Sequence, residues 1–322
     1  MEQGQKAILT GMAEGKDGQF NSFRDLMKAR SGDDMPPAES EEKKAKDKGW
    51  TLEDEYGDQV EVDDKALAEL PDPALAETWL PRVAEGAAIL GVGHSQSPFI
   101  ADAHVADLLL MAIDGELHAI AGDALQLEPQ PSNDGSQRLF RVDAKVSAQT
   151  CVATGATAAA LLESALDRGA LFSAAQALGV ADRLIELAVD YANQREQFGV
   201  PIGSFQAVKH MLADVKVALE YARSHVYRAA NSVARATEGR AVDVSMAKLA
   251  ACEAANRASR VSLQVHGAIG YTYEQDVHIW MKRAWSLEAA FGNSVFHNQR
   301  LASGVIDRTI PAQSFGYISA EA

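Results

Sequence analysis

Cysteine is nearly absent from this chain of 322 residues, which contains only Cys151 and Cys252. Two cysteines cannot form a disulfide framework, so we expect reduced thiols and a cytoplasmic protein. Long apolar runs are missing too, since none approaches the roughly 18 residues of a membrane span. The first residues lack the basic and then apolar order of a signal peptide. We therefore expect no membrane span and no secretion signal.

Positive charge is scarce as well. The 30 lysines and arginines are outnumbered by 45 aspartates and glutamates, which gives a net charge of −15. Proteins that bind nucleic acid draw their affinity from lysine and arginine, so this balance argues against a nucleic-acid partner. The acidity is uneven, because residues 1–90 hold 21 acidic and 11 basic residues. The acidity is therefore concentrated in the N-terminal part of the chain.

The common site motifs are also missing. The sequence has no P-loop, no GxGxxG fingerprint and no GxSxG nucleophile elbow. None of its eight histidines belongs to an HExxH motif or a short His-x-His pair, so we expect no metal site.

The patterns that are present predict an α+β protein, mainly α-helical with a small β domain. Residues 1–87 read as a short, acidic helical segment, with helical spacing over 20–27 and a linker of disordered type at 31–49. Residues 88–152 contain short apolar or alternating runs separated by turn residues. Asp114-Gly115 is a hairpin-turn pair within them. We predict a small antiparallel β domain here.

Residues 153–322 predict a C-terminal four-helix bundle. Helical periodicity covers 156–194, 204–237, 243–266 and 275–308, and short connections favour antiparallel neighbours. Ser204 is the expected N-cap of the second helix, and Glu238-Gly239 its expected stop. The last helical stretch is interrupted near Phe291-Gly292-Asn293.

Two polar, glycine-containing segments interrupt the helical region. The first, Arg195-Glu196-Gln197-Phe198-Gly199, precedes a Pro-containing turn, and the second runs from Gln264 to Thr272. Turn geometry and a helix C-cap at Gly267 explain both without any function. The functional interpretation is that Arg195 offers a planar fork to a phosphate, and that Gly267 allows close backbone approach to a ligand. The residues alone leave both interpretations open.

Together these two segments resemble the C-terminal helical domain of the acyl-CoA dehydrogenase family. The resemblance is clear over about residues 155–305, weak over 80–150 and absent over 1–75. It implies an N-terminal helical domain, a middle β domain and a C-terminal four-helix bundle. It also implies a flavoenzyme in which a carboxylate removes the α-proton of an acyl-CoA while the β-hydride passes to FAD.

The resemblance further implies which residues contact FAD, and that they reach the flavin of a neighbouring subunit. From the first segment and the helix after it these are Arg195, Phe198 and Gln206. From the second segment they are Gln264, Val265, His266, Gly267 and Ala268.

The sequence departs from the family where a chain builds its own site. The family's catalytic Glu falls on Phe291, which cannot accept a proton. The alternative base position falls on Gly169. The family's Thr-x-Gln, which touches the chain's own FAD, is Asn293-Ser294-Val295. Glu288 and Asp167 are the nearby carboxylates that remain as weak candidates for a relocated base.

Three hypotheses follow. The first is a base-lacking subunit that completes the FAD site of an acyl-CoA dehydrogenase-like partner carrying the catalytic Glu, in an α2β2 heterotetramer. Some bacterial members, including those that act on steroid-derived acyl-CoAs, resemble this arrangement. The second is a self-sufficient acyl-CoA dehydrogenase with a displaced base, Glu288 or Asp167. The third is a non-catalytic scaffold or regulatory protein that has kept the bundle.

Overall fold

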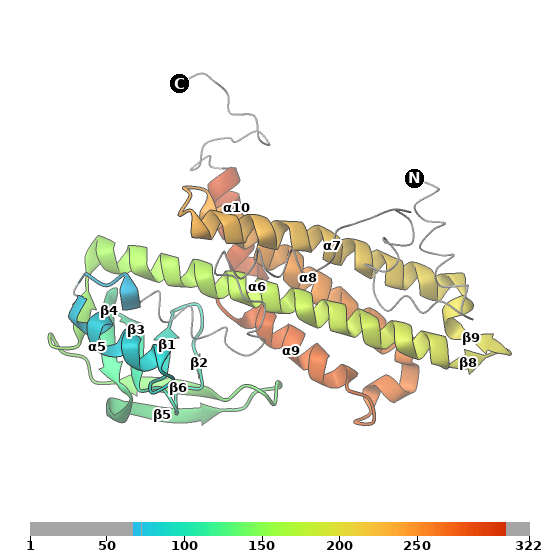
Figure 1. Ribbon diagram of the computed structural model, residues 1–322, viewed down its shortest axis with the longest axis horizontal. Helices are drawn as coiled ribbons and strands as arrows, with labels where there is room; N and C mark the ends of the chain where they lie inside the picture. Colours follow the sequence, from blue (N-terminus) through green and yellow to red (C-terminus); the bar gives the residue numbers. More distant parts are fainter. Residues whose placement is uncertain (1–66, 72, 307–322) are drawn as a thin grey trace, which may run out of the picture.

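The computed structural model describes residues 67–71 and 73–306. The helix predicted over 20–27 and the linker predicted at 31–49 lie outside these residues. Within them, the predicted fold is confirmed: most residues are helical, and a small domain of short strands sits at one end of a bundle of long helices (Figure 1). No helix in this part of the chain combines the length and apolarity needed to cross a membrane.

The β domain follows helix α5 (Pro73–Ala84) and contains two sheets. The first has the order β1-β3-β4-β7 and the second the order β2-β6-β5. The strands are β1 (Leu90–Gly93), β2 (Ile100–Ala101), β3 (Leu108–Ile113), β4 (Glu116–Ala121), β5 (Leu125–Gln130), β6 (Leu139–Ala144) and β7 (Cys151–Ala153).

The strand pairing differs from the predicted antiparallel domain at one place, because β1 and β3 are parallel. The chain leaves β1, crosses to the second sheet as β2 and returns before β3, so β3 runs in the direction of β1. The other pairs in these two sheets are antiparallel. The predicted turn between β3 and β4 is confirmed, with Asp114 and Gly115 both at positive φ, as a type I′ hairpin requires.

The bundle begins with a 40-residue helix, α6 (Gly155–Gln194), which runs from the β domain to the far end of the molecule (Figure 1). There the small hairpin of β8 (Glu196–Gln197) and β9 (Val200–Pro201) and the 3-10 turn η2 (Ile202–Ser204) reverse the chain. The remaining elements are α7 (Gln206–Ala234), α8 (Arg240–His266), the 3-10 turn η3 (Gly267–Tyr271), α9 (Val277–Ala289) and α10 (Ser294–Val305).

Alanine dominates the core of the bundle. The buried residues that α6 and α8 contribute to it are mostly alanines, including Ala174, Ala181, Ala251 and Ala255, all without exposed surface. Small side chains let helix axes approach closely, and larger residues such as Leu184 and Leu219 fill the remaining space. This explains how a helix as rich in Ala and Ser as α8 can lie at the centre of the bundle.

Two helix ends differ from the sequence-based prediction. Ser204 does not cap α7, since its hydroxyl donates to the Pro201 carbonyl oxygen within the η2 turn. Glu238-Gly239 does not end α7 either, because that helix stops at Ala234 and Gly239 precedes α8. In both cases, residues that are typical of helix caps lie instead in a tight turn between two helices.

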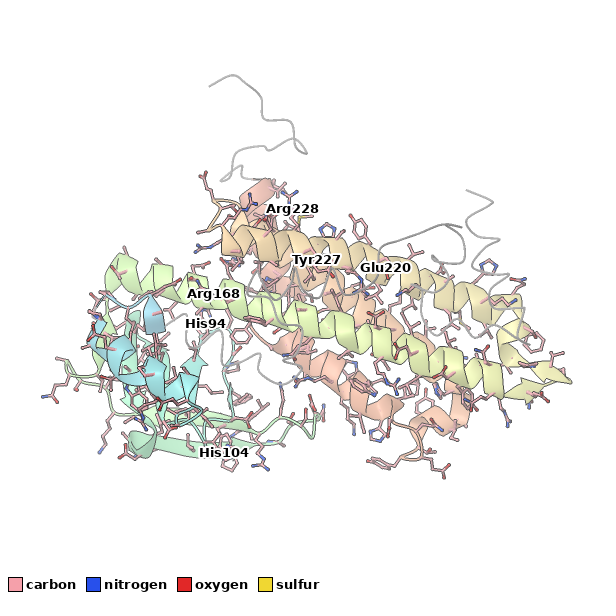
Figure 2. The ribbon with its side chains drawn as sticks, in the orientation of Figure 1. His94, His104, Arg168, Glu220, Tyr227 and Arg228 are labelled. Carbon is pink, nitrogen blue, oxygen red and sulfur yellow. The ribbon has the colours of Figure 1, made fainter. Side chains whose placement is uncertain are left out.

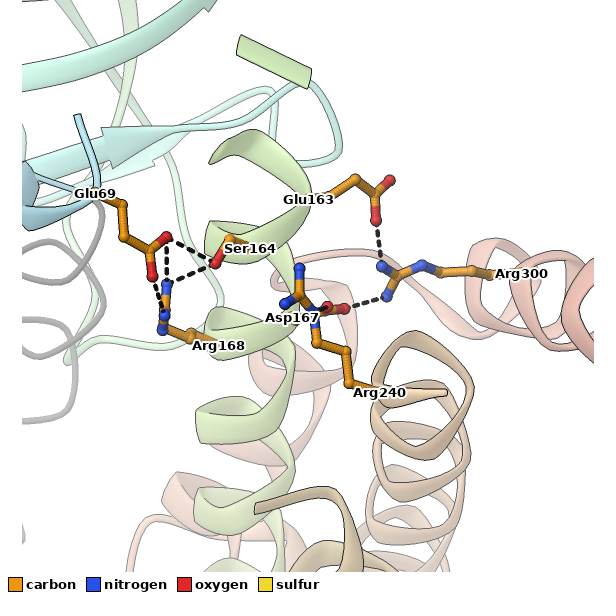
Figure 3. A network of polar contacts seen from close by, with 7 residues as sticks. All are labelled: Glu69, Glu163, Ser164, Asp167, Arg168, Arg240 and Arg300. Carbon is orange, nitrogen blue, oxygen red and sulfur yellow. Dashed lines mark hydrogen bonds and ion pairs between the residues drawn. The ribbon is translucent and has the colours of Figure 1, made fainter. Parts of the chain in front are cut away.

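Polar networks join the helices. Arg228, labelled on α7 in Figure 2, donates to Asp243 at the start of α8 over 2.7 Å. Near the β domain, Glu69 pairs with Arg168 on α6 over 2.5 Å and accepts from Ser164 (Figure 3). Burial raises the pKa of Glu69, but the hydrogen bonds from Arg168 and Ser164 outweigh this effect and lower it. Glu69, in the short described segment 67–71, is thereby fastened to α6.

Candidate functional site

The two segments singled out in the sequence lie at the same end of the bundle, opposite the β domain. A small apolar cluster packs the last turns of α6 and α8 against η2 and the first turns of α7. Its buried members are Ala188, Ala192, Leu212 and Val265. The Tyr191 ring stacks on the His266 ring with centroids 4.5 Å apart. The hairpin and the end of α8 therefore form one packed unit.

The β8–β9 hairpin presents a charged and an aromatic side chain to solvent. Arg195 is exposed, and no carboxylate among the described residues pairs with its guanidinium. Phe198 is 94% exposed and has a positive φ, as does the neighbouring Gly199. Phe205 meets the Phe198 ring edge to face at 6.2 Å, and Gln206 is exposed at the start of α7. Phe198 and Phe205 thus form a small exposed aromatic pair at the hairpin.

The end of α8 divides into residues that face outward and residues that support them. Gln264, Gly267 and Ala268 are exposed, whereas Val265 and His266 are buried. His266 Nδ1 donates to the Ser262 carbonyl oxygen over 2.8 Å. Gly267 adopts φ 62° and ψ −138°, a conformation that a residue with a Cβ rarely takes. Only the three exposed residues can touch a ligand directly.

This end of the bundle has the chemistry to hold part of FAD. A free guanidinium binds phosphate oxygens through two parallel hydrogen bonds, and an exposed amide and an exposed aromatic ring suit a nucleotide or flavin. The site is open to solvent on the chain itself, so its residues would hold such a group from one side only. These exposed residues are Arg195, Phe198, Gln206, Gln264, Gly267 and Ala268.

A second feature lies where the sequence places its missing base. The Phe291 ring packs directly on α6 at Gly169, because a Cβ on that glycine would lie 2.3 Å from the ring. Phe291 has a positive φ, uncommon for a bulky residue. Its N–H donates to Ser97 Oγ over 3.1 Å, and its carbonyl oxygen accepts from His297 Nε2 over 3.0 Å. The two positions assigned to a base thus lie in contact, because the ring of Phe291 packs directly against Gly169.

His297 and Lys248 hydrogen-bond the backbone at the end of α9 and at Phe291. His297 has no exposed surface, and burial is the main reason that its pKa falls to about 4. The charges of Lys248 and Arg300 add to that fall, while the Phe291 carbonyl opposes it. Lys248 is also buried, which lowers its pKa, and its Nζ donates to the carbonyl oxygens of Leu287 and Ala290. The end of α9 is therefore tied to α8.

Sequence reasoning missed Ser97, Lys248 and His297. A signal was available for Lys248, the single lysine of the Ala-rich helix α8. No local signal marks Ser97, which lies 194 residues from its partner.

The two remaining carboxylates are both engaged. Asp167 is buried between Arg240 and Arg300, at 2.9 and 2.7 Å (Figure 3). Glu288 accepts from Asn256 over 2.7 Å and lines a cavity of about 430 Å³ between α8, α9 and α10. Among the described residues, no three His, Cys, Asp or Glu side chains are grouped to hold a metal ion.

Comparison with known proteins agrees with this architecture. Residues 159–306 match the family model for the acyl-CoA dehydrogenase C-terminal domain. The acyl-CoA dehydrogenase IpdE2 of Mycobacterium tuberculosis is 33% identical over 205 residues, which cover 64% of this chain and 59% of that protein. The chain spans about three fifths of the length of the curated IpdE2 relatives it matches.

Solved structures share the fold. One is the ChsE4-ChsE5 complex from Mycobacterium tuberculosis, with a TM-score of 0.65 and 26% identity, covering 80% of this chain and 76% of that one. Another is butyryl-CoA dehydrogenase from Megasphaera elsdenii, with a TM-score of 0.69 and 22% identity, covering 78% and 76%.

Proposed function

We infer that this chain belongs to the acyl-CoA dehydrogenase family through its C-terminal helical domain, and on that premise we propose that it is a base-lacking subunit of a FAD-dependent acyl-CoA dehydrogenase. In this role it completes the FAD site of an acyl-CoA dehydrogenase-like partner, which supplies the catalytic Glu. The reaction is the α,β-dehydrogenation of an acyl-CoA thioester.

One observation carries the proposal: the contact between Phe291 and Gly169. A base must stand within hydrogen-bond reach of the α-proton that it removes. Neither of the two positions that resemble the family's base carries a carboxylate. The Phe291 ring lies against the α6 backbone at Gly169, so the two positions leave no free space between them. These features favour a chain whose own acyl site is closed.

The exposed end of the bundle gives the chain its role toward FAD. Bound FAD supplies the chemistry of hydride acceptance, and the chain's own residues contribute binding only. The Arg195 guanidinium neutralises phosphate charge, and Phe198 covers apolar ring surface. Gln264 provides an amide, and Gly267 and Ala268 provide accessible backbone. Because the site faces outward, its ligand has to be held from the other side by a second subunit.

A self-sufficient enzyme with a displaced base is the weaker alternative. Arg240 and Arg300 both pair with the buried Asp167 carboxylate, at 2.9 and 2.7 Å, so its oxygens are engaged within the bundle. Glu288 hydrogen-bonds Asn256 on the α8 side of its helix. Neither arrangement resembles a base aimed at a thioester.

We further propose an α2β2 heterotetramer in the cytoplasm that takes part in lipid or steroid catabolism. The likeness to one chain of the ChsE4-ChsE5 complex supports a heteromeric assembly. A steroid acyl-CoA dehydrogenase with a TM-score of 0.67 and 22% identity shares the fold, which makes steroid-derived thioesters reasonable first substrates to test.

The decisive experiment is co-expression with an acyl-CoA dehydrogenase-like subunit that carries an intact Glu-Gly-Thr triplet, followed by purification and measurement of the flavin-to-subunit ratio. We expect co-purification, one FAD for every two subunits, and turnover only in the complex. Full flavin occupancy with turnover in the isolated chain would contradict the proposal. Co-purification without any flavin would instead favour a scaffold.

A further inference from the structure

The connection between β5 and β6 reaches from the β domain to the bundle (Figure 1). Residues 131–137 of this connection are called the β5–β6 loop below. Within the loop, Asp134 is 3% exposed, although its neighbours Asn133 and Gly135 are exposed. A carboxylate this buried needs polar partners, since an unpaired buried charge is costly. The loop therefore turns one charged side chain inward, against the bundle.

Both oxygens of the Asp134 carboxylate are engaged. Oδ1 accepts from the N–H and the hydroxyl of Ser136, at 3.0 and 2.7 Å, which fixes the turn of the loop. Oδ2 accepts from Arg283 on α9 over 3.3 Å. The same guanidinium donates to Gln176 on α6 over 2.6 Å. Arg283 thus joins three parts of the chain: the β5–β6 loop, α9 and α6.

Gln137 makes a second contact with α9, because its side-chain carbonyl oxygen accepts from the Ser286 hydroxyl. Arg283 and Ser286 are three residues apart, so they lie on one face of the helix. Further along, the Phe291 N–H donates to Ser97 Oγ, which lies between β1 and β2. The β domain therefore holds α9 and the turn after it at three points.

These three contacts surround the place where the resemblance puts a chain's own site. The base position falls on Phe291, and the segment that would touch the chain's own FAD is 293–295. Domains of one chain ordinarily move relative to each other unless their interface resists the motion. Movement of the β domain away from α9 has to break the ion pair of a buried carboxylate and two hydrogen bonds. A ligand that enters between them has to break the same contacts.

We propose that the β5–β6 loop is a latch, in which Asp134 and Gln137 hold the β domain closed on α9 throughout turnover of the complex. The inference rests on the proposed function and adds the device that keeps this chain's own site shut. With this junction closed, no flavin or acyl group enters between the β domain and α9, and the chain supports its partner as a rigid frame. The latch takes no part in binding or chemistry at the partner's site.

The first test fixes the latch covalently in the co-expressed complex. Gln137→Cys and Ser286→Cys are introduced together with Cys151→Ser, which removes a partly exposed thiol, and a short bifunctional thiol reagent joins the new pair. The control is the Cys151→Ser complex treated in the same way, and peptide mass spectrometry measures the bridged fraction. We expect turnover and FAD content within twofold of the control. A tenfold loss of turnover in the bridged fraction would show that the junction opens during the reaction and would overturn the inference.

The second test loosens the latch and measures hydrogen exchange in the complex. Asp134→Ala and Gln137→Ala are introduced together, and the control is Asp143→Ala, since Asp143 is exposed on β6 and makes no ion pair within the described part of the chain. We expect amides of the β5–β6 loop and of the last turn of α9 to exchange at least tenfold faster in the double variant, and within twofold of wild type in the control. Loop amides that exchange at the unprotected rate in the wild type would overturn the inference.

Hydrogen exchange requires neither flavin nor turnover, so it separates the latch from the proposed function. A wild-type complex without FAD or turnover, whose loop amides are protected and depend on Asp134, would reject the proposed function and uphold the closed junction. An active complex that contains FAD but leaves the β5–β6 loop unprotected would reject the latch alone.

Discussion

At the scale of single residues, the contact between Gly169 and Phe291 permits a direct measurement. A Cβ added at Gly169 would meet three atoms of the Phe291 ring at 2.3 to 2.6 Å. We expect Gly169→Ala to lower the free energy of unfolding by about 2 kcal/mol, the usual scale of overpacking. Urea unfolding of the purified protein measures the change.

The matched control for this substitution is Gly179→Ala on the same helix. Nothing lies within 4 Å of a Cβ at Gly179. Alanine is the better helix former, so this change is expected to raise the free energy of unfolding by about 0.5–1 kcal/mol. Combining Gly169→Ala with Phe291→Ala should remove the clash. The double variant should therefore lose less free energy of unfolding than the sum of the losses in the two single variants. Additive losses would show that the ring and the glycine do not interact.

His297 predicts a pH dependence of stability. Its folded pKa of about 4 lies below its ordinary value of 6.5, so the unfolded chain binds the proton more readily. The contribution of His297 to stability is therefore highest above pH 6.5 and falls as the pH drops toward 4, by about 3 kcal/mol for the full shift. His297→Gln should flatten this fall between pH 6.5 and 5 when unfolding is measured at each pH. The exposed His104, labelled in Figure 2, provides the control variant His104→Gln, which should keep the wild-type slope.

At the scale of helices and strands, the cap of α10 predicts a stability effect. The Asn293 side chain accepts from the Phe296 N–H over 3.1 Å. We expect Asn293→Ala to lower the free energy of unfolding by about 1 kcal/mol. Ser204→Ala, at the position that resembles a cap but is not one, should change it by less than about 0.5 kcal/mol, as is usual for surface substitutions. Equal losses in both variants would mean that the caps are wrongly assigned.

The same contrast shows what a sequence can predict about this fold. Apolar periodicity locates the helices to within a few residues, since burial of one face is a local property of the pattern. The Asp114-Gly115 turn is predictable because few residue pairs tolerate two positive φ values. The parallel pairing of β1 with β3 and the bond from Phe291 to Ser97 depend on chain segments brought together from a distance. No local preference encodes such contacts.

The candidate site divides in a similar way. Arg195, Gln264 and Gly267 were identified because charge and glycine stand out against helices rich in alanine and leucine. That Val265 and His266 face inward depends on which side of α8 meets α6, as the stack of His266 on Tyr191 shows.

At the scale of the whole molecule, the isolated chain is expected to be flavin-poor and inactive. Its candidate FAD contacts face solvent, and nothing among the described residues encloses a ligand against them. Expression without a partner should yield protein with little flavin absorbance at 450 nm. Added FAD should bind at least a hundredfold more weakly than in the complex, because a cofactor held from one side loses half of its contacts. Tight stoichiometric binding by the isolated chain would contradict this expectation.

The complex also separates the proposed function from the displaced-base alternative. Glu288→Gln keeps the shape of the side chain and can still hydrogen-bond Asn256. Turnover by the complex should therefore remain within twofold of wild type. A loss of more than a thousandfold would identify Glu288 as the base and reject the proposed division of labour.

The turn at Phe291 has an evolutionary consequence. Replacing this residue with glutamate would place a carboxylate against the α6 backbone in the space that the ring now fills, so this first step would cost stability. The acyl space would also have to reopen, which requires changes at several positions at once. A lineage that carries this ring would therefore need several mutations before the chain could act without a partner subunit. The two subunits of such an enzyme would then be bound to persist as a pair.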